Sequence, residues 1–82
     1  MTATKYIATM TILFDNGVNR DYTVYDGYTD HLADDALFDI KSYIDNSLAQ
    51  HTMVRFTTVD GDSVMINPAK IVTVNSSVTT TD

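Results

Sequence analysis

The chain has 82 residues, which allows one small domain and leaves little apolar core to stabilise it. It has no cysteine, which excludes disulfides and thiolate metal sites, and no apolar run approaches the about 20 residues of a membrane-spanning helix. All eleven acidic residues are Asp, and the net charge of −6 disfavours nucleic acid and anionic lipid as direct partners.

The N-terminal residues 1–5 are expected to form a flexible tail. They lead directly into an alternating segment and not into the apolar block of a signal peptide, so we expect a cytoplasmic protein. Residues 6–14 alternate with a period of two and are rich in β-branched side chains, which predicts a strand.

Asp15-Asn16-Gly17 predicts a hairpin turn, after which residues 18–25 return as a second strand. A three-residue loop with Gly17 in the left-handed conformation places Phe14 opposite Val18, Met10 opposite Tyr22 and Ala8 opposite Val24. We favour this register over a two-residue loop because it gathers the apolar residues on one face, with Arg20 as the one charged exception.

Helical periodicity occurs only in the middle of the chain, over residues 34–50, with residues 31–33 as a loop or a first turn. The predicted buried stripe consists of Ala33, Leu37, Ile40, Ile44, Ser47 and Leu48. Thr29, Asp30 or Asp34 can each cap the helix, and the sequence leaves that choice open.

The second half of the chain predicts another hairpin, with strands over residues 53–59 and 63–67 around an Asp60-Gly61-Asp62 turn. Val64 and Ile66 are expected to pair with Thr58 and Phe56. Pro68 interrupts this ladder as a bulge, a bend or an edge. Residues 71–74 are expected to form a short last strand, followed by a disordered tail over residues 75–82.

The order of these elements indicates an α+β fold, a ββαββ domain over residues 6–74 with a short fifth strand and one helix packed on one face of an antiparallel sheet. The other sheet face is expected to carry Ile7, Leu13, Tyr25, Val59, Met65 and either Val72 or Val74, interleaved with Thr. Such a face is either solvated or a dimer or partner surface.

The sequence offers no constellation typical of catalysis or metal binding, so we expect no enzymatic activity, no cofactor and no metal site. No Ser lies in a nucleophile motif, and the three glycines form no phosphate loop. Residues 15–21 lack the Gly and Glu of an EF-hand loop, and His31 and His51 flank the helix about 30 Å apart.

The one feature that suggests a partner is a window of acidic residues between Arg20 and Lys41 that contains no Lys or Arg. Within it, the predicted partner-binding residues are Asp26, Asp30, Asp34, Asp35 and Asp39. They would present spaced carboxylates to a basic protein surface. The alternative is that this charge only keeps a small protein soluble.

The segment from Met53 to Ile71 reads as a strand, an Asp-Gly turn, a strand, and then Asn-Pro followed by Ile. Together with the Asp/Asn/Thr-rich composition, it resembles small uncharacterised proteins of Gram-positive bacteria and their phages. The resemblance implies a bacterial or phage origin and brings no activity or functional residue with it.

These observations predict a non-enzymatic protein–protein interaction module. The sharper form of this hypothesis is an acidic inhibitor or nucleic-acid mimic that uses the Asp-rich loop and helix start. The alternative is a structural or assembly subunit that forms a homodimer through the outer sheet face or through the edge strand beside Pro68.

Overall fold

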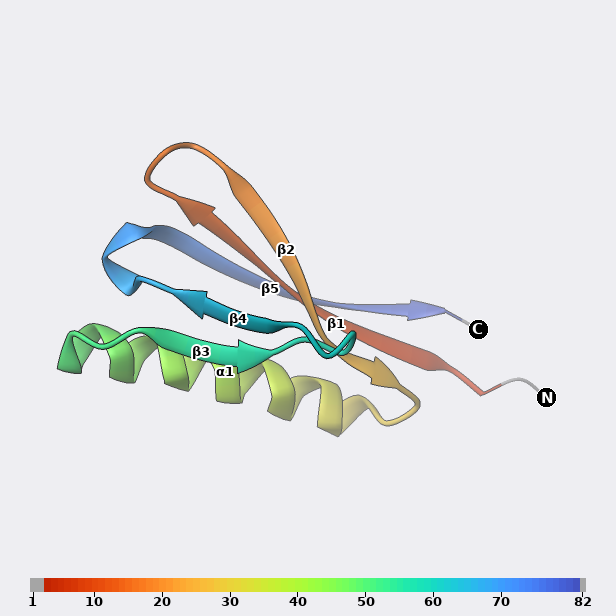
Figure 1. Cartoon of the computed structure of the whole chain (residues 1–82). Coiled ribbons are helices and arrows are strands. Elements are labelled where there is room, and N and C mark those ends of the chain that lie inside the picture. The colour runs from red at the N-terminus through yellow and green to blue at the C-terminus, as the bar shows by residue number, and fades with distance from the viewer. Residues whose placement is uncertain (1–2, 82) are drawn as a thin grey trace.

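Three long strands form one antiparallel sheet in the order β2-β1-β5, and a single helix lies against it (Figure 1). The computed structural model describes residues 3–81. In chain order its elements are β1 (Lys5–Phe14), β2 (Asn19–Gly27), α1 (Asp30–Gln50), β3 (Val54–Thr57), β4 (Ser63–Ile66), the 3-10 turn η1 (Pro68–Lys70) and β5 (Ile71–Thr81). Strands β3 and β4 form a separate two-stranded hairpin. The predicted α+β architecture is confirmed.

The core lies between the sheet, the helix and the second hairpin. Alternate residues of β1, the predicted stripe of α1 and the inward side chains of β3 and β4 supply it: Ala8, Met10, Ile12, Ala33, Leu37, Ile40, Ile44, Val54, Phe56 and Ile66. The rings of Tyr22 and Phe56 meet edge to face with centroids 5.4 Å apart, which joins the sheet to the hairpin. The apolar residues that alternate along the strands and those that form the helix stripe therefore pack together in one core.

The first hairpin closes as the sequence predicts. Gly17 has a φ of 84°, and the Phe14 amide donates to the Val18 carbonyl at 2.9 Å. Met10 pairs with Tyr22, as expected. The pairing of Ala8 with Val24 is wrong: Ala8 pairs with Tyr25, because a bulge beside Ala8 inserts one extra residue into β2.

Helix α1 begins after Thr29, the first of the three candidate caps, although the Thr29 side chain makes no capping hydrogen bond. It ends at His51, whose left-handed backbone lets its amide donate to the Ser47 carbonyl. The predicted stripe is confirmed except at Leu48, which is 48% exposed. Leu48 lies in the last turn, where it lines a shallow groove beside Pro68 and is not packed into the core.

The second hairpin has the predicted faces but a different register. Phe56 pairs with Val64 and Val54 pairs with Ile66, so the expected pairs are wrong by two residues. The cause is the position of the turn: the Thr58 amide donates to the Asp62 carbonyl at 3.0 Å, so the three-residue loop is Val59-Asp60-Gly61, with Gly61 at a φ of 86°, and not Asp60-Gly61-Asp62. A shift of two keeps every side chain on its predicted face. Pro68 interrupts the chain as expected, as the start of η1.

The largest correction concerns the C-terminal strand. The chain was expected to leave the sheet after Val74, but β5 continues to Thr81 and pairs with β1 as far as Lys5. Consequently the sheet includes residue 5, expected in the flexible tail, and residues 75–81, expected to be disordered. Thr and Val in this segment have high strand propensity, and β1 offers them an edge along its whole length. Residues 1, 2 and 82 lie outside the described residues.

Candidate functional site

The predicted acidic residues are exposed, but they do not form one row. Asp30, Asp34, Asp35 and Asp39 project from the first half of α1, whereas Asp26 lies near the end of β2. Asp34 and Asp35 are consecutive and hence about 100° apart around the helix, so only pairs such as Asp35 and Asp39 share a face. The carboxylates therefore spread around the exposed side of α1.

Asp26 is the one member of this set that has a cationic partner among the described residues. Its carboxylate lies 3.0 Å from the Lys5 ammonium. The hydrogen bond from this ammonium, and then the attraction of the two charges, raise the pKa of Lys5. Asp26 thus serves to hold the start of β1 to the end of β2, and the charge open to a partner is that of the four helix carboxylates.

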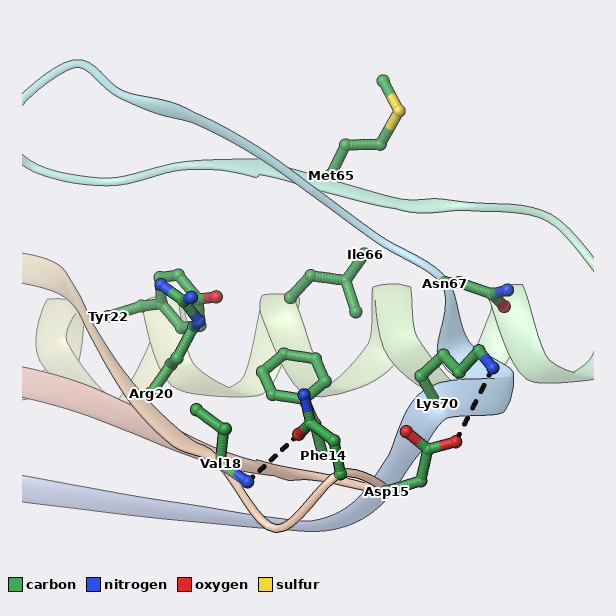
Figure 2. Close-up of a pocket in the computed structure, with 10 residues that line it drawn as sticks. Phe14, Asp15, Val18, Arg20, Tyr22, Met65, Ile66, Asn67 and Lys70 are labelled. Atoms are coloured by element: carbon green, nitrogen blue, oxygen red, sulfur yellow. Dashed lines mark hydrogen bonds and ion pairs between the residues drawn. The ribbon is translucent and has the colours of Figure 1, made fainter.

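A groove with a basic rim lies between the first hairpin turn and η1 (Figure 2). Its volume is about 540 Å³, and Phe14, Tyr22 and Ile66 contribute apolar surface to it. Lys70 at its rim forms an ion pair with Asp15 at 3.7 Å, whereas no ion pair within residues 3–81 involves Arg20. The sequence signal for this groove was Arg20 itself, a lone charge in the apolar register of the first hairpin.

The open edge of β5 is the most extended binding surface on the described chain. One edge of β5 pairs with β1, and no other described strand pairs with the second edge. Its eleven residues contain no charged side chain, no Pro and no Gly, and residues 75–81 are all exposed. An unpaired row of backbone amides and carbonyls of this length is a template for another strand.

The other strand edges of the described chain carry charged side chains or are short. On β2, the other edge of the sheet, there are charged side chains such as Arg20 and Asp21 and the bulge opposite Ala8. The Val59 amide also donates to the Thr23 carbonyl at 3.1 Å and covers part of that edge. Strands β3 and β4 are only four residues long. Within residues 3–81, β5 is therefore the long uncharged edge, and its one register irregularity, at Val72, lies near its N-terminal end.

The outer face of the sheet is more polar than the sequence predicts. On β1 it carries Ile7, Thr9, Thr11 and Leu13, and their partners on β5 are Thr79, Ser77, Asn75 and Thr73. Tyr25 was expected here, as was either Val72 or Val74; Tyr25 and Val74 instead pack against the core, whereas Val72 is exposed. The bulge places Tyr25 opposite Ala8 and so on the core face of β2, and Val74 lies opposite the buried Ile12. Val59 and Met65 are exposed, but they belong to the second hairpin and its loop.

The structure brings none of the other candidate side chains together. His31 and His51 lie at opposite ends of α1, and Asp21 accepts a hydrogen bond from the Thr11 hydroxyl at 2.7 Å. Among the described residues, no three His or Asp side chains gather closely enough to hold a metal ion. In the same part of the chain, no helix is long and apolar enough to cross a membrane.

The chain matches no protein-family model, no curated protein and no solved structure at a significant level. The resemblance of residues 53–71 to small proteins of Gram-positive bacteria and their phages therefore stays a prediction.

Proposed function

We propose that this protein is a non-enzymatic assembly subunit that works by accepting an extended segment at the open edge of β5. The observation that supports this proposal is the edge itself: eleven consecutive residues without charge, Pro or Gly, unpaired on one side. Of the two hypotheses from the sequence, this corresponds to self-association or assembly through the edge strand beside Pro68.

Strand addition uses the backbone as its main source of affinity. An added antiparallel strand of equal length forms about ten backbone hydrogen bonds with β5, and hydrogen-bonded and non-hydrogen-bonded residue pairs alternate along the ladder. The side chains of β5 select the partner, because alternate residues line the two faces of the extended sheet. Val74 and Val78 lie on the core side, and the Thr-rich set lies on the other.

The acidic side of α1 is a second candidate surface, because none of its four carboxylates forms an ion pair with a Lys or Arg of residues 3–81. With a net charge of −6, this side would attract a basic protein surface, as an acidic inhibitor or nucleic-acid mimic does. Such a contact would weaken steeply with salt, whereas a contact made by backbone hydrogen bonds would not.

One capture experiment separates the two surfaces. The baits are the wild type, the edge variant Asn75→Lys/Ser77→Lys and the acidic variant Asp34→Ser/Asp35→Ser/Asp39→Ser, each exposed to a nuclease-treated bacterial lysate that contains an added, differently tagged copy of the wild-type chain. We expect the edge variant to retain about tenfold less partner than the wild type, since charges at an exposed edge oppose strand pairing. We expect the acidic variant to retain it.

The matched control for the edge variant is Asn46→Lys/Gln50→Lys, which adds the same charge on exposed positions of α1. This control should capture as the wild type does. Equal capture by the wild type and the edge variant would contradict the proposed function. If only the acidic variant fails to retain the partner, the contact lies on the acidic side of α1 and not on β5.

A further inference from the structure

We propose that the strand accepted by β5 is β5 of a second copy of this chain, antiparallel and centred on Ser76. This inference rests on the proposed function and names its partner. The dimer that results joins two three-stranded sheets into one sheet with the order β2-β1-β5-β5-β1-β2.

The proposed register rests on two-fold symmetry and on the side chains that it brings together. Directly opposed residues in an antiparallel pair point to the same face, so a two-fold axis must pass through a residue that faces its own copy. Ser76 is the midpoint of β5, which runs from Ile71 to Thr81. A pair centred on Ser76 opposes residues 73–79 of both strands in regular alternation, and Val72, which is bulged in the pairing with β1, lies at the outer end of that ladder.

The side chains in this register match in chemical type. Val74 of each copy faces Val78 of the other, Thr73 faces Thr79, and Asn75 faces Ser77. Moving the centre by one residue in either direction places Val74 opposite Ser76 or Thr80. Among these three registers, the one centred on Ser76 is therefore the one in which the two Val residues meet across the interface, where β-branched pairs stabilise sheets.

The core side of β5 is incomplete in a single copy. Val78 lies opposite Ala8, which is fully buried, yet Val78 itself is 36% exposed. In the view of Figure 1, the C-terminal end of β5 projects past the N-terminal end of α1. In the proposed dimer this uncovered end lies beside the Ile71 end of the second copy. Val74 of that copy then covers Val78 and extends the apolar layer.

The distribution of charge also favours a second copy at this edge. Two chains with a net charge of −6 repel each other, so a stable contact must avoid their carboxylates. The β5 strand has no charged residue, and the acidic side of α1 is the side turned away from the core. A contact through one strand per copy is small, so the dimer should be reversible and concentration-dependent.

Cysteine cross-linking tests the register directly, because the chain has no cysteine of its own. In Ser76→Cys, the two thiols face each other across the two-fold axis, within the Cα separation that a disulfide needs. We expect oxidation to cross-link Ser76→Cys about tenfold faster than Ser77→Cys or Asp62→Cys, whose thiols have no counterpart opposite. Equal rates, or a faster reaction of Ser77→Cys, would overturn this register.

Sedimentation of folded, uncross-linked protein supplies an independent readout. The wild type should show a concentration-dependent dimer that Asn75→Lys/Ser77→Lys lacks. An equimolar mixture of that variant with Asn75→Asp/Ser77→Asp should regain the dimer at low salt, because unlike charges then face each other. A wild type that stays monomeric, with a foreign protein still captured through the edge, would overturn self-pairing and leave the proposed function standing. A dimer that the edge variant forms as strongly as the wild type, together with equal capture of every partner by both, would overturn both proposals.

Discussion

Replacing Ile40 by Asp is expected to leave the chain unfolded at room temperature. Ile40 is 5% exposed and lies in the middle of the buried stripe of α1. Removing a buried Ile side chain costs about 2–5 kcal/mol, and an unpaired carboxylate at the same place adds to that cost. A chain of this length has a total stability of roughly 4–12 kcal/mol, so the loss is comparable to the whole. Circular dichroism during heating should show no cooperative transition.

The matched control is Phe38→Asp, two residues away on the same helix. Phe38 is 70% exposed, so the same new charge should shift the free energy of unfolding by no more than about 0.5 kcal/mol. A cooperative melt of Ile40→Asp near the wild-type temperature would show that α1 buries a different face.

Removing residues 75–82 is expected to unfold the domain or nearly so. Seven of the ten Cα pairs between β1 and β5 are lost with this segment, from Lys5–Thr81 to Thr11–Asn75. At about 1 kcal/mol net for each backbone hydrogen bond, the loss is on the order of 5 kcal/mol. The core side of β1 at Ala8 and Met10 also becomes exposed at its edge. Urea titration followed by circular dichroism measures the change.

A full-length control keeps the ladder while changing the same segment. Asn75→Thr/Ser77→Thr places β-branched residues at exposed positions of β5 and should melt at or above the wild-type temperature. Should the shortened chain instead unfold at the wild-type urea concentration, residues 75–81 would contribute nothing to the sheet.

The helix and the turns could be predicted from the sequence because local patterns determine them. The spacing of Leu37, Ile40 and Ile44 fits one face of a helix, and Gly17 supplies the positive φ that its turn requires. Where a competing local interaction exists, prediction fails in detail. The Thr58 amide closes the second turn on the Asp62 carbonyl with Gly61 as the last loop residue, so the second hairpin pairs two residues away from the expected register.

The extent of β5 could not be predicted because its residues fit two environments equally well. Thr, Ser and Asn are common in disordered tails, and Thr is also common in strands, where the decision depends on a neighbouring edge. The free edge of β1 supplies that neighbour, and it is visible only once the sheet order is known. The same reason applies to the candidate site, because an open edge is a property of strand order and not of local sequence.

The acidic residues show the opposite case, in which the sequence names the residues but not their arrangement. All of the predicted set are exposed, yet Asp26 is engaged by Lys5, and the four on α1 surround its exposed side. Their separation from β5 lets the two surfaces act independently. A protein that assembles through an uncharged edge can keep its charge for solubility or for a basic partner.

Hydrogen exchange resolved for each amide of β5, at low and at high protein concentration, tests the account most directly. Alternate amides of an edge strand face its neighbour and the open side. We predict that at low concentration the amides facing β1 are protected and the alternate set exchanges rapidly. At high concentration the second set should become protected as well. Identical exchange of that set at both concentrations would contradict strand addition between copies, and rapid exchange of both sets would contradict the ordered strand itself.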